Sequence, residues 1–523
     1  MRLLRSPADL AAWRRQQPER PLHFVPTMGC LHRGHASLLK RAAEPRAGGP
    51  PPRVLLSVFV NPLQFGPGED YERYPRDLEA DRVLAAAAGA DALFAPSPAA
   101  LYPGGEPQLS RVLAPPALAA VLCGRSRPGH FDGVATVVCR LLALVHPQRL
   151  LLGEKDWQQR QVLRRVIRDL GLGVAVEGCP TVREADGLAC SSRLRYLGVA
   201  DRSRAAAVAQ ALAAVADLHR AGERQGAALI TAARQRLRAA GLEEDYVELV
   251  HPLSLAPLAE AGGCSMLAVA ARCGDCRLID HLVLMSRPPI VAIDGPAGAG
   301  KSTVTRALAR RLGLLYLDTG AMYRALTWWV REQGVDPGDA AAVAPLLGDL
   351  DLRLLVGADG EQQVLLNGHD VTAAIRSPEI TALVSSVAAH PCVRDALTAQ
   401  QRAMGSRGGL VAEGRDIGTA VFPDAECKIF LTASVAERAR RRALDLAERG
   451  FPVPPQAELA ESIAERDRLD SSRAVAPLRQ AEDAVEVLTD GLTIEAVLTA
   501  LEDLFRERVP EDAWPGPSSV ASP

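Results

Sequence analysis

The chain has 523 residues, a length that exceeds one ordinary hydrophobic core and predicts two to four domains. With 48% hydrophobic and 23% charged residues it has a globular composition, and its formal net charge of −2 excludes a general positive field that would attract nucleic acid. Its apolar stretches are too short for a membrane span, and the N-terminus lacks a signal-peptide core. We therefore expect a cytoplasmic protein with neither a membrane nor a nucleic-acid partner.

Residues 1–180 alternate between short apolar runs and longer helical patterns. Buried strands are predicted for "LHFVPTM", "RVLLSVFVN", "ADALFAPS" and "RLLLGEKD". Helices are predicted for residues 34–43, "DLEADRVLAAAAG", "VATVVCRLLALV" and "WQQRQVLRRVIRDL". This alternation is typical of a doubly wound, Rossmann-like parallel sheet, whose ligands bind at the carboxyl ends of the strands.

The segment "VPTMGCLHRGH" places His32 and His35 at a strand-to-helix turn. The pair could be ordinary helix-start residues, or it could bind a metal, although no third ligand lies nearby in the sequence. It could also serve a nucleotide, because imidazoles beside a helix N-terminus can donate hydrogen bonds to a phosphate on which charge develops. Polar residues at other predicted strand ends and turns favour the nucleotide site: "FVNPLQFG", "RPGHFDGVAT", "LLGEKDWQQ" and "DGLACSSRLRYL".

These motifs closely resemble the pantothenate synthetase (pantoate–β-alanine ligase) family over residues 1–284. The resemblance implies that pantoate and ATP give pantoyl adenylate and pyrophosphate, with Mg²⁺ on the phosphates, and that the amine of β-alanine then releases AMP. It implies that His32, His35 and Lys155 are catalytic. It assigns ATP contacts to Met28, Gly29, His32, His35, Gly153, Glu154, Lys155, Asp156, Cys190, Ser191, Ser192 and Arg193, and pantoate or β-alanine contacts to Asn61, Gln64, Arg127, His130 and Gln159.

Two positions depart from the family pattern. Leu194 follows Ser-Ser-Arg where the family usually has Asn, and Leu152 precedes "GEKD" where an aromatic residue is common. Neither change removes a group with an assigned chemical role. Family members are commonly dimers, so the resemblance also implies a homodimer formed through this half of the chain.

Residues 181–284 predict a smaller α+β domain that closes over the site, with helices at 203–221 and 225–240 and strands at "DYVELV" and "SMLAVAAR". Ten cysteines are spread along the chain and are expected to be reduced thiols. Cys273 and Cys276 have C-x-x-C spacing, but no second pair follows, so a metal or redox role is not favoured and no structural metal is expected. The short segment "MSRPP" is a tight junction.

A second alternating pattern starts at Ile290, and "IVAIDGPAGAGKSTVTRALARRL" reads as strand, glycine-rich loop and helix. It contains the complete G-x-x-x-x-G-K-[ST] pattern, in which backbone N–H groups surround the phosphates, Lys301 reaches the β- and γ-phosphates and Ser302 holds Mg²⁺. A chance glycine-rich turn would not have all these parts in order. The predicted ATP-binding loop comprises Gly295, Pro296, Ala297, Gly298, Ala299, Gly300, Lys301, Ser302 and Thr303.

The downstream segments are rich in arginine. Arginine clusters commonly form solvated helix faces, but a transferred phosphoryl group requires positive charge around it. Arg466 and Arg473 are seven residues apart and would share a helix face if both are helical.

Together, "DGPAGAGKST", "LDTGAMYR", "EGRDIGT" and "SRAVAPL" resemble the bacterial cytidylate kinase family over residues 288–505. The resemblance implies that ATP phosphorylates CMP or dCMP, with Lys301 and Arg466 catalytic. It places Thr319, Ser385, Arg394, Asp416 and Arg473 at the base and sugar of the acceptor, Tyr323, Arg324, Arg415 and Arg466 near its phosphate, and Arg438 and Arg442 in a lid over ATP.

The predicted organisation is therefore 1–180, 181–284 and 285–508, with a monophosphate-binding insert at about 345–407 and a disordered tail at 509–523. Magnesium-bound ATP is the expected cosubstrate of both halves, and no tightly bound organic cofactor is expected. Two alternatives stay open: the first half could be a simple nucleotidyltransferase or a nucleotide-sensing module, and the second could phosphorylate another small acceptor, such as UMP or shikimate.

Overall fold

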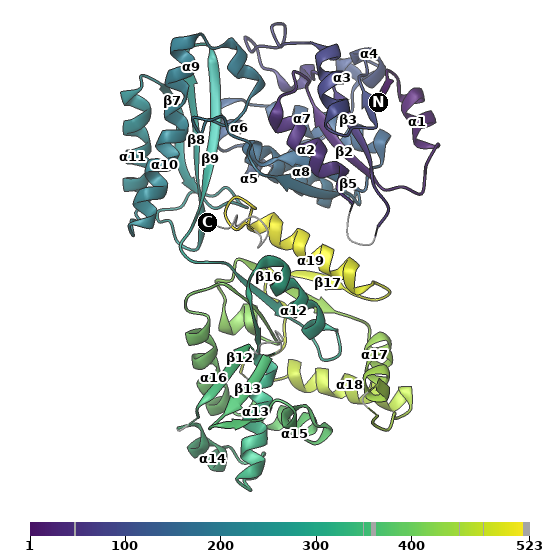
Figure 1. Cartoon of the computed structure of the whole chain (residues 1–523), viewed down its shortest axis with the longest axis vertical. Helices are drawn as coiled ribbons and strands as arrows, with labels where there is room; N and C mark the ends of the chain where they lie inside the picture. Colours follow the sequence, from purple (N-terminus) through teal and green to yellow (C-terminus); the bar gives the residue numbers. More distant parts are fainter. Residues whose placement is uncertain (46–48, 349, 357–361, 449, 474, 516–523) are drawn as a thin grey trace. The chain divides into compact units, whose positions relative to one another are not determined.

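The computed structural model of the chain describes residues 1–45, 49–348, 350–356, 362–448, 450–473 and 475–515. Two compact units are present (Figure 1). The first contains Met1–Ser286 together with Arg506–Ala513, and the second contains Arg287–Phe505 together with the end of the chain from Trp514. The boundary at Ser286 lies two residues beyond the predicted end of the first half at 284.

A six-stranded parallel sheet with the order β1-β4-β3-β2-β5-β6 forms the centre of the first unit. Its helices cover both faces, because α1, α7 and α8 contribute to one hydrophobic cluster and α2 and α3 to another. This confirms the doubly wound α/β prediction. The strands are β1 (Arg2–Leu4), β2 (Leu22–Thr27), β3 (Arg53–Val58), β4 (Ala92–Phe94), β5 (Arg149–Gly153) and β6 (Ala175–Cys179), and the main helices are α1 (Pro7–Arg14), α2 (Arg33–Ala43), α3 (Leu78–Ala87), α7 (His130–Val145) and α8 (Trp157–Asp169).

Three short helices lie between β4 and α7: α4 (Pro98–Leu101), α5 (Pro116–Ala119) and α6 (Cys123–Ser126). The smaller part of the unit is an antiparallel sheet, β7 (Glu243–Val250), β8 (Cys264–Cys273) and β9 (Cys276–Met285). One face of this sheet joins the core of the larger part, and the other packs against α10 (Ala207–Arg220) and α11 (Gly226–Ala239). A single helix over 203–221 is wrong, because Ala206 forms a turn that ends α9 (Val199–Ala205) and begins α10.

Cys273 and Cys276 face each other in register at the β8–β9 turn. Both are free and buried, and each thiol has a backbone partner: Cys273 Sγ donates to the Asp201 carbonyl at 3.2 Å, and Cys276 Sγ to the Arg193 carbonyl at 3.5 Å. All ten cysteines lie among the described residues, and none of them forms a disulfide.

The second unit contains a five-stranded parallel sheet with the order β11-β15-β10-β16-β17. The helices α13, α15 and α16 share a hydrophobic cluster with one face of it, and a three-stranded antiparallel sheet lies within the predicted insert. Its strands are β10 (Ile290–Asp294), β11 (Leu315–Asp318), β12 (Leu352–Val356), β13 (Gln362–Leu366), β14 (His369–Asp370), β15 (Leu410–Gly414), β16 (Cys427–Thr432) and β17 (Val485–Leu488). The helices are α12 (Lys301–Leu312), α13 (Thr319–Glu332), α14 (Ala340–Val343), α15 (Pro378–Ala389), α16 (Pro391–Met404), α17 (Val435–Glu448), α18 (Gln456–Ser471) and α19 (Ile494–Arg508).

Part of the tail that was expected to be disordered has a defined place. Val509 is buried, and residues up to Ala513 belong to the first unit. There, the Asp512 carboxylate accepts a hydrogen bond from the Thr181 N–H at 3.3 Å. Residues 516–523, the rest of the predicted tail, lie outside the described residues.

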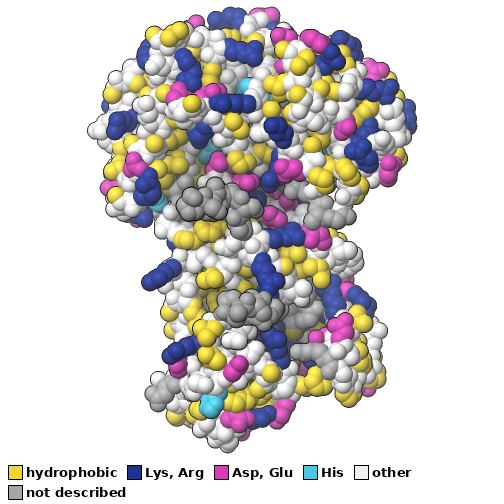
Figure 2. All heavy atoms as spheres, in the orientation of Figure 1, with side chains coloured by type: hydrophobic (Ala, Val, Ile, Leu, Met, Phe, Trp, Pro, Cys, Tyr) yellow, Lys and Arg dark blue, Asp and Glu magenta, His cyan; other side chains and the backbone are white. Residues whose placement is uncertain are grey.

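Figure 2 shows Lys and Arg side chains interspersed with Asp and Glu side chains on the visible face, as the nearly balanced net charge leads one to expect. Among the described residues, no helix combines the length and apolarity required to cross a bilayer.

Candidate functional sites

The turn after β2 depends on a glycine. Gly29 has φ +84°, and a Cβ there would lie 2.8 Å from a carboxylate oxygen of Asp81 and 2.9 Å from Val58. The buried Asp81 carboxylate accepts hydrogen bonds from the backbone N–H groups of Cys30 at 3.0 Å and Leu31 at 2.7 Å. This anchor directs the chain from the end of β2 into α2.

His32 and His35 form the start of α2. The His32 Nδ1 accepts from the Gly34 N–H at 3.1 Å, the His35 Nδ1 accepts from the His32 N–H at 3.2 Å, and the two ring centroids are 4.1 Å apart. Because each Nδ1 is an acceptor, the proton of each neutral imidazole lies on Nε2. The helix-start interpretation is therefore correct, and it leaves both Nε2–H groups available to donate to a ligand.

Both rings are held neutral. Burial, followed by the charge of Lys155, lowers the pKa of His32 to about 4. Burial, followed by the neighbouring His32 and then Lys155, lowers the pKa of His35 to about 3. At neutral pH the pair consists of hydrogen-bond donors without charge, next to a lysine that supplies the charge.

These pKa values predict how stability depends on pH. Between about pH 6.5 and pH 4, histidines bind protons in the unfolded chain, whereas His32 and His35 in the folded chain do not. The free energy of unfolding of the first unit should therefore fall as the pH falls through this window, by up to about 1.4 kcal/mol per pH unit for each group. Urea unfolding followed by hydrogen exchange in residues 22–43 at pH 7 and pH 5 measures this. The substitution His35→Gln should flatten the dependence, and an unchanged slope would contradict the assignment.

The Ser-Ser-Arg turn lies against the histidine turn, although about 160 residues separate them in the sequence. The Ser192 hydroxyl donates to the Cys30 carbonyl at 3.0 Å, and the Arg33 Nε–H donates to the thiol of Cys190 at 3.4 Å. The structure therefore brings together two motifs that were predicted to share one nucleotide.

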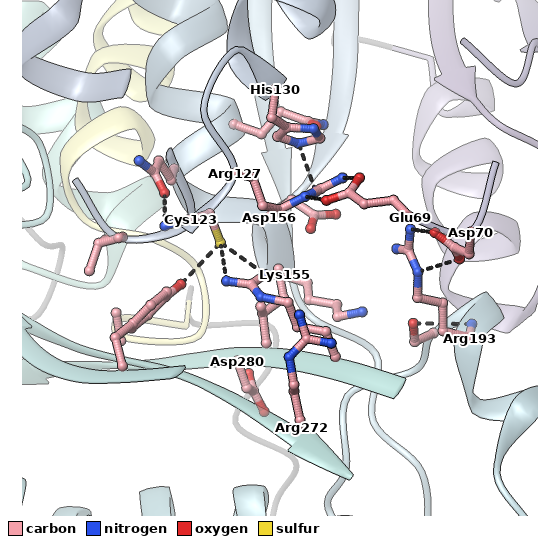
Figure 3. Close-up of a pocket in the computed structure, with 18 of the residues that line it drawn as sticks. Glu69, Asp70, Cys123, Arg127, His130, Lys155, Asp156, Arg193, Arg272 and Asp280 are labelled. Atoms are coloured by element: carbon pink, nitrogen blue, oxygen red, sulfur yellow. Dashed lines mark hydrogen bonds and ion pairs between the residues drawn. The ribbon is translucent and has the colours of Figure 1, made fainter. Parts of the chain in front are cut away.

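A cavity of about 720 Å³ lies between the two parts of the first unit (Figure 3). Seven residues with predicted roles line it: Arg127, His130, Lys155, Asp156, Gln159, Ser191 and Arg193. Met28, Gly29, His32, His35, Asn61, Gln64, Gly153, Glu154, Cys190 and Ser192 are not in its lining. The cavity also exposes charged residues of the smaller part for which no role was predicted, among them Arg272 on β8 and Arg277 on β9. Arg272 ends a predicted strand but belongs to no motif, and β9 was not predicted.

Asn61 and Gln64, which were both predicted to bind substrate, make different contacts. The buried Asn61 accepts from the Tyr102 hydroxyl at 2.9 Å and donates to the Gly133 carbonyl at 3.0 Å, so it anchors its turn. Its amide also donates to the Gln64 Oε1 at 3.0 Å. Arg127 donates to the Gln64 carbonyl at 3.1 Å, so it helps to hold the same segment. Gln64 is the member of this group whose amide nitrogen stays available for a ligand.

His130 belongs to the same arrangement. Its Nδ1 lies 2.8 Å from the Gln64 carbonyl oxygen, and burial, followed by the charge of Arg127, lowers its pKa to about 4.

Glu154 points into the protein rather than into the cavity. Its carboxylate is buried beside Arg160 at 3.4 Å, and burial raises its pKa to about 7. A Cβ at Gly178 would lie 2.6 Å from both the Arg160 Cζ and a Glu154 oxygen. Gly178 therefore leaves the space that the pair of Glu154 and Arg160 occupies. Glu154 comes immediately before Lys155 in the chain.

Gly178→Ala should therefore lower the free energy of unfolding of the first unit by about 2–4 kcal/mol, because it separates a buried ion pair. Gly262→Ala is the matched control, since a Cβ there has no atom within 4 Å. Urea unfolding of both variants measures the difference. Equal stabilities would show that the pair accommodates the methyl group.

The two departures from the family pattern are apolar packing positions. Leu152 is buried in the main core, and Leu194 packs against the core of the smaller part.

In the second unit, the glycine-rich loop connects β10 to α12. A Cβ at Gly295, which has φ +149°, would lie 2.0 Å from the Leu431 carbonyl oxygen, so a larger residue cannot stand there. The buried Lys301 ammonium donates to the carbonyls of Gly295 at 2.7 Å and Pro296 at 2.8 Å. Burial, followed by the charge of Arg415, lowers its pKa well below the usual value.

The Ser302 hydroxyl lies in a polar cluster with Glu413. It donates to the Glu413 Oε1 at 2.7 Å, and the Tyr316 hydroxyl donates to the same oxygen at 2.6 Å. The other oxygen of Glu413 is buried without a hydrogen-bond partner among the described residues. Serine and carboxylate oxygens are the ligands that Mg²⁺ prefers, so these residues fit a magnesium ion carried by the nucleotide.

Four arginines surround the next part of this site. Arg415 pairs with Asp470 at 3.0 Å, Arg473 pairs with the same carboxylate, and Arg324 pairs with Asp318 at 3.0 Å. Within the described residues, Arg466 has neither an ion pair nor a hydrogen bond. Burial and then Arg415 lower its pKa to about 10, as expected for a cation held close to other cations.

Arg466 and Arg473 would share a helix face only if both were helical, and this condition is not met, because α18 ends at Ser471. Arg473 still comes close to the helix through its ion pair with Asp470.

The other predicted acceptor residues form a buried group. Arg394 pairs with Asp416, and its guanidinium lies 5.6 Å from the ring centroid of Tyr323, whose hydroxyl is buried without a partner among the described residues. The Thr319 hydroxyl donates to the Glu413 carbonyl at 2.7 Å, so it is used within the fold. Ser385 lies half-buried on α15.

The predicted lid arginines also differ in their contacts. Arg438 donates to the Ala297 carbonyl of the glycine-rich loop at 3.2 Å, whereas Arg442 pairs with Asp445 on its own helix. Arg441, which lies within the predicted lid segment 438–442, donates to the Ala299 carbonyl at 3.2 Å.

Two α/β units with differently built candidate nucleotide sites are the arrangement expected of a bifunctional nucleotide-dependent enzyme. The family model for pantoate–β-alanine ligase matches residues 2–283, and that for cytidylate kinase matches residues 291–507. The bifunctional pantoate ligase/cytidylate kinase of Synechococcus sp. (strain CC9605) is 62% identical over 94% of this chain and 100% of its own length. That of Parasynechococcus marenigrum (strain WH8102) is 61% identical over 99% of this chain and 100% of its own length. The chain belongs to the family of bifunctional pantoate ligase/cytidylate kinases.

A solved structure supports the first unit separately. The pantothenate synthetase from Thermus thermophilus is 48% identical, with a TM-score of 0.51, and the match covers 54% of this chain and 99% of that chain. We call the first unit the ligase unit and the second the kinase unit.

Proposed function

We propose that the ligase unit condenses pantoate with β-alanine through pantoyl adenylate, releasing pyrophosphate and AMP, and that the kinase unit transfers the γ-phosphoryl group of ATP to CMP or dCMP. The observation that carries the first proposal is the pair of neutral imidazoles, His32 and His35, beside Lys155; in the part of the chain that the structure describes, neither Nε2–H has a hydrogen-bond partner. The observation that carries the second is the half-buried Arg466, which has no ion pair among the described residues and lies close to Lys301 and Arg415.

In the ligase unit, a carboxylate oxygen of pantoate attacks the α-phosphorus of ATP while the bond to pyrophosphate breaks. His32 and His35 donate hydrogen bonds to the phosphate oxygens, and Lys155 stabilises the negative charge that develops. The amides of Gln64 and Gln159 orient pantoate through its hydroxyl groups. The uncharged amine of β-alanine then attacks the acyl carbon of the adenylate, and AMP leaves.

In the kinase unit, an oxygen of the acceptor phosphate attacks the γ-phosphorus of ATP, and ADP leaves. Lys301, Arg415 and Arg466 stabilise the charge on the transferred group and place the two substrates in line. The pair of Arg394 and Asp416 provides donors and acceptors for a base and sugar. Mg²⁺ bound with the nucleotide would be held by Ser302 and Glu413, and it supplies charge neutralisation of the phosphates.

Two assays test the assignments on the intact chain. ATP with pantoate should give AMP only when β-alanine is also present, together with pantothenate; AMP release independent of β-alanine would favour a simple nucleotidyltransferase. ATP with a panel of CMP, dCMP, UMP and shikimate should give rapid turnover with the cytidine nucleotides. A preference for another acceptor would overturn the kinase assignment.

We further propose that residues 1–180 form the adenylate-forming domain and 181–284 its closing domain, and that the chain forms a cytoplasmic homodimer through the ligase unit, as the family resemblance implies. Sedimentation of the full chain, compared with that of a fragment ending near Met285, tests the dimer. A monomeric fragment from a dimeric chain would locate the interface elsewhere.

A further inference from the structure

The arginines of the ligase cavity are mostly neutralised by neighbouring carboxylates. Figure 3 shows two of these pairs joined by dashed lines. The paired arginines are Arg127 with Glu69 at 2.6 Å, Arg193 with Asp70 at 2.9 Å, Arg277 with Asp245 at 2.6 Å and Arg73 with Asp275 at 4.0 Å.

Two cations in this lining have no such partner. Among the described residues, neither Lys155 nor Arg272 makes an ion pair or a side-chain hydrogen bond. Lys155 follows β5 of the larger domain, whereas Arg272 is exposed near the end of β8 in the smaller domain, and its side chain rises from that strand toward the side of the cavity that carries Lys155 (Figure 3). Glu243, the cross-strand neighbour of Arg272 on β7, forms no ion pair with it.

We propose that Arg272 binds the β- and γ-phosphates of ATP, and then the leaving pyrophosphate, from the closing-domain side of the cavity, opposite Lys155. The proposal rests on the proposed ligase function. As the pantoate oxygen bonds to the α-phosphorus, the bond from that phosphorus to the bridging oxygen breaks, and its electron pair goes to pyrophosphate. Charge therefore increases on the group that Arg272 contacts, and an unpaired guanidinium stabilises it.

Phosphate is a better match than a substrate carboxylate for two reasons. An anion that contacts both Lys155 and Arg272 must bridge two domains, and a triphosphate has the length and the charge to do so. Ser191 and Arg193, which come from the predicted ATP motif, line the same cavity. The guanidinium fork also suits bidentate binding of phosphate oxygens.

Steady-state pantothenate synthesis by the full chain tests the proposal. Arg272→Gln should raise the KM for ATP and the inhibition constant for pyrophosphate by about 10- to 100-fold, as expected for the loss of a charge-assisted hydrogen bond. The KM values for pantoate and β-alanine should change less than twofold. Arg272→Lys should restore only part of the affinity for ATP and pyrophosphate, because lysine keeps the charge but not the two-pronged guanidinium. Arg238→Gln changes an exposed arginine on α11 outside the cavity and should match the unchanged chain.

A binding measurement keeps the test independent of turnover. Calorimetric titration of magnesium pyrophosphate into the Lys301→Ala chain, in which the kinase site is impaired, should show binding that Arg272→Gln weakens by a similar factor. Unchanged ATP and pyrophosphate constants in Arg272→Gln, or a raised KM for pantoate or β-alanine instead, would overturn the proposal. If the unchanged chain makes no pantothenate, the ligase function fails, and the titration still decides whether Arg272 binds phosphate.

Discussion

Lys301→Ala should reduce CMP phosphorylation by about 10³-fold or more and leave pantothenate synthesis nearly unchanged. The ammonium is buried in the glycine-rich loop, and among the described residues it donates only to the carbonyls of Gly295 and Pro296. When ATP binds, the Lys301 ammonium can contact the β- and γ-phosphates instead of these carbonyls. Positive groups that contact the phosphates supply most of the catalysis of phosphoryl transfer. Coupled assays for ADP from CMP and for pantothenate, on the same preparation, measure both activities.

The unchanged ligase activity is the internal control of this experiment, because it shows that the chain is folded and binds ATP elsewhere. Loss of both activities in a folded Lys301→Ala chain would contradict the two-site organisation. A second variant, Arg466→Gln, should show a similar pattern, because Arg466 has no ion pair within the described residues that its loss would leave unbalanced.

The local motifs of this chain could be predicted because their chemistry and their geometry depend on neighbours in the sequence. The glycine-rich loop is one such case: β10, the loop and α12 follow in the expected order. The histidine turn is another, where the alternatives of helix start and ligand site are compatible, since Nδ1 serves the helix and Nε2 stays free.

Contacts between distant segments could not be predicted in the same way. The pairing of Arg193 with Asp70 joins residues 123 positions apart, and that of Arg415 with Asp470 joins residues 55 apart. No period or motif in the sequence relates such positions. The shared helix face of Arg466 and Arg473 was expected only if both residues were helical, and α18 ends at Ser471, before Arg473.

Burial also decides roles that composition leaves open. Glu154 stands in the "GEKD" motif beside Lys155, yet its side chain turns inward to Arg160 while Lys155 lines the cavity. Both residues belong to the short 3₁₀ turn Glu154–Asp156 that follows β5, where successive side chains point about 120° apart. A motif therefore identifies a site without showing which of its members face the ligand. Arg272 shows the converse, because it belongs to no motif and lies in the cavity without a partner among the described residues.

His35→Gln should reduce pantothenate synthesis by about 10²- to 10³-fold, the usual effect of removing one donor to a developing negative charge. The choice of glutamine separates two roles of this residue. A glutamine at the third position of a helix can accept from the N-cap N–H, so the bond from the His32 N–H is kept while the Nε2–H donor is lost. The CMP kinase activity should stay within twofold of that of the unchanged chain.

Two further variants make the result decisive. His35→Ala should lose the same activity and in addition about 1 kcal/mol of stability, because it also removes the helix cap. His251→Ala, a histidine in an exposed turn outside the cavity lining, should keep full ligase activity. If His35→Gln retained near-normal pantothenate synthesis while His35→Ala lost it, His35 would act only as a helix cap, and the phosphate chemistry would belong to His32 and Lys155.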